Sequence, residues 1–240
     1  MGFFRDKALR IGREKNSRII LALDLYAERR DEKELVSAKI SRILSNLKDY
    51  IAGVKIGLPT LLTLGLENVE KIISKHRDEL FFIADMKIAD IGYVSRVLVR
   101  KASETGFDAV ISHAIMGQWV LKEIVDEARK SNVGVLTVCA MSHMGANESI
   151  NTLFRKNLEF SLKVGVDGFI LPATMPEYIR EARAKTKEHL IASPGVGVQG
   201  AKPGAAVEAG ADFEIIGRSI YLASDPVKAA RNYDERLRWV

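Results

Sequence analysis

The chain has 240 residues, of which 47% are hydrophobic and 28% are charged, so it can fold around one large core. Its net charge is +5, and the basic residues are interspersed with acidic ones along the chain. No aromatic residues alternate with basic ones as a base-stacking surface requires, so we expect no nucleic-acid partner. No apolar run reaches the roughly 18 residues of a membrane-spanning helix, so we expect no membrane partner either.

Residues 1–17 are predicted to form a short N-terminal extension. The stretch MGFFRDKALRIGREK lacks the apolar core of a signal peptide. Asp6 stands where a myristoylation signal has serine or threonine. We therefore expect an amphipathic segment that packs on the body of the protein.

Eight short apolar runs follow the extension. Each is rich in Val, Ile, Leu or Phe and is too short for a buried helix, so each is predicted to be a strand. The runs cover residues 18–25, 51–58, 80–88, 109–115, 134–141, 167–173, 189–196 and 213–219.

Segments with helical periodicity lie between these runs. The first is predicted to place an apolar stripe on one face, formed by Leu35, Ile40, Ile43, Leu44 and Leu47. Gly106, Gly165 and Gly210 lie just past predicted helix ends, where glycine commonly caps a helix. The phrases ETGFDAV, KVGVDGF and EAGADFE repeat one junction from helix to strand.

Eight strands alternating with helices predict an α/β fold, a single (β/α)8 TIM barrel that spans residues 1–240 as one domain. The competing architecture is a doubly wound open sheet, which has a glycine-rich turn after its first strand. Here the first run leads into DLYAERRDEKE, which contains no glycine. The barrel is therefore favoured.

Cys139 is the one cysteine of the chain and lies in the fifth run. A single thiol forms no internal disulfide and no cysteine-rich metal site. We expect a small core residue, and the cytoplasm is the expected compartment.

Charged residues stand at the carboxyl ends of the first three predicted strands, where TIM barrels build their active sites. They are Asp24, Lys55, Asp85 and Lys87, followed by Asp90. Because alternate residues of a strand share a face, Asp85 and Lys87 are predicted to emerge together at the barrel mouth. Asp24 and Lys55 would meet them there from the neighbouring strands.

Two other interpretations of this cluster are weaker. A buried ion-pair network would be a poor stabiliser, because desolvation costs several kcal/mol per ion. A magnesium ion would suit the carboxylates, but the two lysines already neutralise them. We therefore expect catalytic chemistry and no metal.

The segment SPGVGVQGAKPG, residues 193–204, predicts a phosphate site after the seventh strand. Gly195, Gly197 and Gly200 leave backbone N–H groups free to approach an anion. Arg218 follows the eighth strand and can hold a phosphoryl group in a bidentate fork. TIM barrels commonly bind phosphate after strands seven and eight, so the substrate is predicted to be a phosphomonoester.

Other polar residues give weaker signals. The loop 141–149 either closes over a ligand or has no role. His113 is either a site residue or a core histidine, while His76, His143 and His189 show no ligand-like spacing and are treated as structural or surface residues.

The motifs taken together resemble the orotidine 5'-monophosphate decarboxylases of the short archaeal and bacterial type. The resemblance covers nearly the whole chain and rests on Asp-x-Lys-x-x-Asp-Ile at 85–91, with ALDL, GVKIGLP, MSHMGA, SPGVGVQG and GRSIY. It implies a cofactor-independent carboxy-lyase that converts orotidine 5'-monophosphate to uridine 5'-monophosphate in pyrimidine biosynthesis. The chain shows no thiamine, flavin or nickel motif, so no cofactor is expected.

The resemblance also implies roles for individual residues. Lys87 would protonate carbon 6 of the pyrimidine and Asp85 would sit beside the departing carboxylate. Lys55 and Asp24 would hold the ribose hydroxyls, and Asp90 would reach into the site of the partner in a homodimer. The substrate-binding residues would further include Ser142 against the pyrimidine, and Pro194, Gly195, Gln199, Gly217 and Arg218 around the phosphoryl group.

The chain departs from the family pattern after Asp90. Val94 stands where the family usually has threonine, so a hydroxyl contact is lost or is supplied by Ser95. With Gly92 at this position, the segment after Asp90 resembles that of a sister group, the magnesium-dependent 3-keto-gulonate phosphate decarboxylases and hexulose phosphate synthases. That group usually has a glutamate where this chain has Lys55. A non-catalytic barrel that binds phosphate ligands is a second alternative.

Overall fold

Eight parallel strands form a closed barrel in the order β1 to β8, which confirms the predicted (β/α)8 fold. The structure is a computed structural model that describes residues 3–239, with only the backbone at residue 30. The strands are β1 (Ile19–Leu23), β2 (Gly53–Gly57), β3 (Phe81–Ile88), β4 (Ala109–His113), β5 (Gly134–Val138), β6 (Gly168–Ile170), β7 (Leu190–Pro194) and β8 (Phe213–Ile216). Each lies inside one of the apolar runs.

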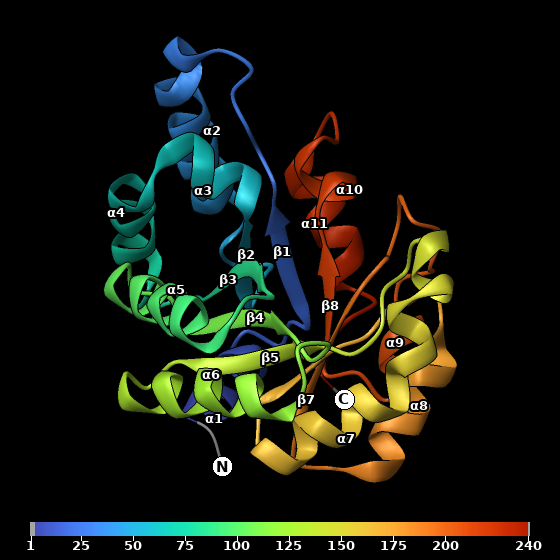
Figure 1. Cartoon of the computed structure of the whole chain (residues 1–240). Helices are drawn as coiled ribbons and strands as arrows, with labels where there is room; N and C mark the ends of the chain where they lie inside the picture. The colour runs from blue at the N-terminus through green and yellow to red at the C-terminus, as the bar shows by residue number, and fades with distance from the viewer. Residues whose placement is uncertain (1–2, 240) are drawn as a thin grey trace.

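Helices form a layer around the strands (Figure 1). They are α1 (Phe3–Glu14), α2 (Lys33–Leu47), α3 (Leu58–Leu64), α4 (Leu66–His76), α5 (Gly92–Glu104), α6 (Gln118–Lys130), α7 (Phe154–Val164), α8 (Pro176–Lys185), α9 (Ala205–Glu208), α10 (Arg218–Tyr221) and α11 (Pro226–Asp234). Short 3-10 turns are η1 (Arg30–Glu32), η2 (Met144–Glu148) and η3 (Ile150–Leu153). Within residues 3–239, no helix has the length and apolar character needed to cross a membrane.

One prediction for α2 is wrong. The sequence predicts that Leu35 belongs to the buried stripe, but Leu35 is 70% exposed and Val36 is buried instead. Val36 and Ile40 are four residues apart and therefore lie on one face of the helix, whereas Leu35 is rotated away from that face.

The barrel interior is filled by side chains that alternate along each strand. Ile20, Ala22, Phe81, Ile83, Ala109, Ile111, Leu136, Val138, Ile170, Leu190, Ala192, Phe213 and Ile215 belong to this inner cluster. The remaining apolar side chains of the strands pack outward against the helices in a second, larger cluster.

Helix α1 covers the amino-terminal end of the barrel. Phe4 on α1 contacts Phe81 edge-to-face at 5.6 Å between ring centroids, and Phe81 contacts Phe213 in the same way. Gly53 makes room for this aromatic layer, since a Cβ atom there would lie 2.2 Å from the Phe81 ring. Because this end is closed by packed aromatic rings, the open end of the barrel is the one where the strands finish.

The three repeated junctions share a backbone-binding aspartate. Asp108, Asp167 and Asp212 each stand just before an even-numbered strand, and each accepts a hydrogen bond at 2.9 Å from the N–H of a residue in the preceding strand. Asp108 also pairs with Lys7 of α1, and Asp212 pairs with Arg183 of α8. The repeat therefore fixes neighbouring strands at the closed end.

Candidate active site

A cavity of about 740 Å³ opens at the carboxyl ends of the strands. Every predicted site residue except Asp90 lines it: Asp24, Lys55, Asp85, Lys87, Ser142, Pro194, Gly195, Gln199, Gly217 and Arg218. The volume is in the range of small-molecule sites. One hollow thus contains both the charged cluster and the glycine-rich loop.

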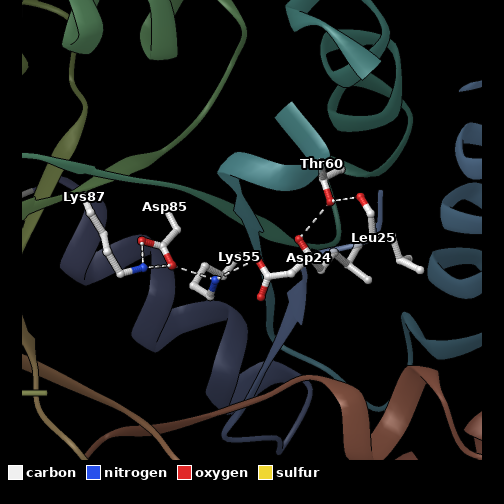
Figure 2. Close-up of polar contacts among 7 residues, drawn as sticks. Asp24, Leu25, Lys55, Thr60, Asp85 and Lys87 are labelled. Atoms are coloured by element: carbon white, nitrogen blue, oxygen red, sulfur yellow. Dashed lines mark hydrogen bonds and ion pairs between the residues drawn. The ribbon is translucent and has the colours of Figure 1, made fainter. Parts of the chain in front are cut away.

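The four charged residues form a row of alternating sign (Figure 2). The Lys55 ammonium lies 2.7 Å from one oxygen of Asp85 and 3.5 Å from Asp24. The Lys87 ammonium contacts both oxygens of Asp85, at 2.8 and 2.9 Å. Lys55 and Asp85 are buried, whereas the side chains of Lys87 and Asp24 are 41% and 43% exposed. Asp24 and Lys87, the two ends of the row, are therefore the members whose charged groups can contact a ligand in the cavity.

Lys87 reaches this row through an irregularity of β3 that simple alternation does not anticipate. The pairing of β3 with β4 shifts between Ala84 and Ile88, so β3 contains extra residues at its carboxyl end. Lys87 itself has a φ of 44°, a backbone conformation that is strained for a residue with a long side chain. The predicted meeting of Asp85 and Lys87 is confirmed, but a bulge produces it.

The two buried members of the row, Lys55 and Asp85, stabilise each other's charged forms. Burial alone would raise the pKa of the Asp85 carboxyl, but Lys55 and Lys87 outweigh it and hold the pKa below its usual value. Burial would likewise lower the pKa of the Lys55 ammonium, but Asp85 and Asp24 raise it above its usual value. A negative Asp85 is thus kept in a nearly dry position between two cations.

Two residues that sequence reasoning missed position Asp24. Gly57, at the end of β2, leaves the space that the Asp24 carboxylate occupies, because a Cβ atom there would lie 1.9 Å from Asp24 Oδ1. The Thr60 hydroxyl lies 2.7 Å from the carbonyl oxygen of Leu25 and 3.2 Å from that of Leu23, on either side of Asp24 (Figure 2). Gly57 stands in the GVKIGLP motif, whereas no sequence signal marks Thr60.

The glycine-rich loop after β7 is a compact turn closed on itself. Gly195, Gly197 and Gly200 have φ values of 114°, 79° and 100°, which glycine adopts without strain. The N–H of Ala201 bonds the Gly195 carbonyl, and the N–H of Gly197 bonds the Ala201 carbonyl. Exposed Arg218 begins α10 on the same wall of the cavity. This part of the cavity is suited to an oxyanion such as a phosphoryl group.

A hydrogen bond joins the two loops above the cavity. The Ser142 hydroxyl donates to the Gln199 side-chain oxygen at 2.7 Å. The cavity is also lined by the apolar side chains of Ile111, Val138 and Ile170 from the barrel interior. A flat ring with a polar edge can therefore lie between the charged row and the two loops.

Asp90 lies outside the cavity of its own chain. Its side chain is exposed at the start of α5, and its carbonyl accepts a hydrogen bond from the Ser95 hydroxyl at 2.9 Å. Ser95 is fully buried and does not line the cavity, so its hydroxyl does not replace the threonine missing at Val94. Gly92 begins α5 and lies against the Glu123 carboxylate of α6, which is 2.2 Å from the place that a Cβ atom would occupy.

Histidines stay outside the cavity. His113 ends β4 but does not line the cavity, and burial together with the nearby Lys87 lowers its pKa. Within residues 3–239, no group of three His, Cys, Asp or Glu side chains is arranged to hold a metal ion. Cys139 is buried, and burial raises the pKa of its thiol to about 11.

The chain is similar in sequence to known proteins over most of its length. The profile of the orotidine 5'-phosphate decarboxylase / HUMPS family matches residues 17–233. The orotidine 5'-phosphate decarboxylase of Pyrococcus abyssi is 41% identical over 219 residues, which cover 90% of this chain and 98% of that protein. The protein of the same name from Methanosarcina mazei is 33% identical over 94% of this chain and 97% of its own length.

Solved structures agree with the sequence comparison. Orotidine 5'-monophosphate decarboxylase from Methanocaldococcus jannaschii, complexed with the inhibitor BMP, has a TM-score of 0.82 at 30% identity, over 92% of this chain and 98% of its own. The Pyrococcus horikoshii OT3 enzyme has a TM-score of 0.79 at 34% identity, over 92% of this chain and 100% of its own. On these matches the chain belongs to the orotidine 5'-phosphate decarboxylase / HUMPS family.

Proposed function

We propose that this protein decarboxylates orotidine 5'-monophosphate to uridine 5'-monophosphate without a metal or an organic cofactor, with Lys87 as the acid. The observation that carries the proposal is the alternating row of Asp24, Lys55, Asp85 and Lys87 on the wall of a cavity that also contains a glycine-rich loop and Arg218. The relatives named orotidine 5'-phosphate decarboxylase support the same reaction.

The substrate fits the cavity in one orientation. The phosphoryl group binds the Gly195–Gly200 loop, Gly217 and Arg218, with Pro194 beside it. Asp24 and Lys55 bind the ribose hydroxyls. The pyrimidine then lies against the apolar lining of the cavity, with its polar edge toward Ser142 and Gln199. Its carbon 6 faces Lys87 and its carboxylate faces Asp85.

The chemical step breaks the bond between carbon 6 and the carboxylate carbon. Carbon dioxide leaves without the bonding electron pair, which stays on carbon 6 as a vinyl-type carbanion. The Lys87 ammonium stabilises this charge and then transfers a proton to carbon 6, and solvent restores the proton to the amine. Lys55 keeps Asp85 ionised throughout, so the repulsion between Asp85 and the substrate carboxylate is relieved as neutral carbon dioxide departs.

Binding energy from the phosphoryl end contributes to this step. Enzymes lower barriers by about 8–23 kcal/mol, and a carbanion without an electron sink requires the upper part of that range. The phosphoryl site holds a group that does not react, so its binding energy can position the pyrimidine against the charged row.

A magnesium requirement would distinguish the sister group, the 3-keto-gulonate phosphate decarboxylases and hexulose phosphate synthases, from the proposed metal-independent activity. We expect the purified protein to convert orotidine 5'-monophosphate at an unchanged rate after treatment with EDTA. The change in absorbance of the pyrimidine measures this rate. Loss of turnover under EDTA that returns with Mg²⁺ would point to the magnesium-dependent chemistry instead.

Removal of the Lys87 ammonium tests the assignment of the acid. Lys87→Ala is expected to lower kcat by at least about 10³-fold, because it removes both the acid and the charge that stabilises the carbanion. Binding of uridine 5'-monophosphate, measured by calorimetry, should remain detectable. A variant with near-normal kcat would reject Lys87 as the proton donor.

The proposed active form is a homodimer in which Asp90 enters the partner's cavity. Asp90 is exposed and does not line its own cavity, and large apolar side chains next to it in sequence and on the neighbouring helix α6 are exposed to solvent. Ile91 and Tyr93 are each 67% exposed and Trp119 is 80% exposed, which is typical of a surface that another chain covers.

Mixing two inactive variants tests this arrangement. Lys87→Ala and Asp90→Ala are each expected to be inactive, whereas hybrid dimers contain one site with both residues intact. Activity should therefore reappear on mixing, up to about a quarter of the wild-type value per site if subunits exchange randomly. Verified subunit exchange with no recovered activity would place Asp90 outside the partner's site.

A further inference from the structure

Glu214 is a buried carboxylate on the outer face of β8. Its neighbours Phe213 and Ile215 point into the barrel, whereas Glu214 is fully buried between the barrel and the loop that leads to α9. Among the described residues, no Lys, Arg or His side chain is within ion-pair distance of it or contributes to its electrostatics. Such a carboxylate is costly to bury, and a packed apolar residue would serve stability better.

Backbone N–H groups are the partners of Glu214. One carboxylate oxygen accepts from Gly204 and from Ala206, each at 3.0 Å, and the second oxygen lies 3.1 Å from the Gly204 nitrogen. Burial raises the pKa of the Glu214 carboxyl, against the lowering effect of these donors. The side chain thus fixes the point at which the loop after β7 enters α9.

This point is one of several attachments of the glycine-rich loop, which include the Ser142–Gln199 hydrogen bond described above. The loop begins directly after Pro194 of β7, and its middle is held by the Ser219 hydroxyl, which accepts from the Val198 N–H at 3.3 Å. Its end is closed by the bonds of Ala201 with Gly195 and Gly197, and the chain then runs straight to Gly204. Without Glu214 the carboxyl-terminal stem of the loop has no side-chain anchor among these contacts.

We infer that Glu214 is a positioning residue that sets the shape of the 195–204 loop and so the affinity for the phosphoryl group of the substrate. The inference rests on the proposed function, because it assigns the phosphoryl group to this loop. Glu214 does not touch the substrate. It acts by holding Gly204 and Ala206, so its loss should affect ligands that carry a phosphoryl group and spare those that do not.

The test compares uridine 5'-monophosphate with uridine by calorimetry. Glu214→Met removes every acceptor at similar volume, and Glu214→Gln keeps one oxygen. We expect Glu214→Met to lower the affinity for uridine 5'-monophosphate about tenfold, because hydrogen bonds to a charged group are lost. Glu214→Gln should have an intermediate affinity, and the affinity for uridine should be unchanged in both variants. KM for orotidine 5'-monophosphate should rise in the same order.

Asp212→Asn is the matched control. Asp212 also lies at β8 and also binds a backbone N–H, that of Ile191, but it lies at the closed end of the barrel. The Asp212→Asn variant should have the wild-type ratio of the affinities for uridine 5'-monophosphate and uridine. Glu214 variants with the wild-type ratio, or with equal losses for both ligands, would overturn the inference, and Glu214→Gln decides if Glu214→Met does not fold. A wild-type protein that binds uridine as tightly as its monophosphate would refute the phosphoryl site itself.

Discussion

At the scale of single residues, the sequence predicts the identity of the charged row better than its geometry. Charges inside apolar runs are conspicuous, and the ends of strands are where a barrel uses them. The bulge that delivers Lys87 leaves no mark in the sequence, because it arises from the pairing of β3 with β4. Gly57 and Thr60 were missed for a similar reason, since their roles depend on an aspartate that is distant in sequence.

The pH dependence of stability tests the coupling of Asp85 to its two lysines. The pKa of Asp85 is lowered in the folded protein, so its ionisation stabilises the fold above the unfolded pKa of about 3.9, and this contribution is lost as pH falls through the folded pKa. The pKa of Lys55 is raised, so its contribution disappears only as pH rises above about 10.4.

We therefore expect the difference in free energy of unfolding between wild type and Asp85→Asn to be constant from about pH 5 to pH 10. The difference should shrink as the pH falls below about 4. On the plateau the variant should be less stable by about 3–5 kcal/mol, since Lys55 loses its nearer carboxylate. Urea unfolding at a series of pH values measures this quantity, and a difference that persists unchanged at pH 3 would contradict the coupling.

At the scale of secondary-structure elements, the strands and helices of the barrel are predictable. For the junctions between them, the sequence predicts the positions but not the contacts. Short β-branched runs between amphipathic segments give all eight strands and their order. The repeated phrases mark where helices stop, but the function of their aspartates becomes visible only when the strands pair. Leu35 shows the remaining error, because it lies one residue before Val36, which occupies the first position of the buried face, while the other four predicted stripe residues are buried.

The junction aspartates should contribute stability without touching the chemistry. Asp108→Ala leaves the buried N–H of Phe82 without its partner and Lys7 without its counterion, so it should lower the free energy of unfolding by about 1–3 kcal/mol. Asp78→Ala is the control, because Asp78 is exposed in the turn before β3. It should change stability by less than about 0.5 kcal/mol. An Asp108→Ala variant as stable as the control would show that the junction carries no strand-fixing role.

At the scale of the whole molecule, the barrel separates stability from chemistry. The closed end is built from aromatic rings, α1 and backbone-binding aspartates, whereas the open end contains the charged row and the glycine-rich loop. Buried charges and a strained lysine are tolerated at the open end because the apolar interior and the outer helical layer hold the strands in place. This division explains how a segment such as FFIADMKIADIG can be both core and active site.

Phe4 provides the final test of this separation. Phe4→Ala removes a fully buried ring that packs on Phe81, at the opposite end of the barrel from Lys87, and should cost about 3–5 kcal/mol of unfolding free energy. Phe3→Ala, which truncates a neighbouring side chain that is 62% exposed, should cost much less. Both variants should keep kcat/KM within about twofold of wild type at a temperature where they are folded, since neither alters the charged row. A folded Phe4→Ala protein with strongly reduced kcat/KM would show that packing at the closed end controls the geometry of Asp85 and Lys87.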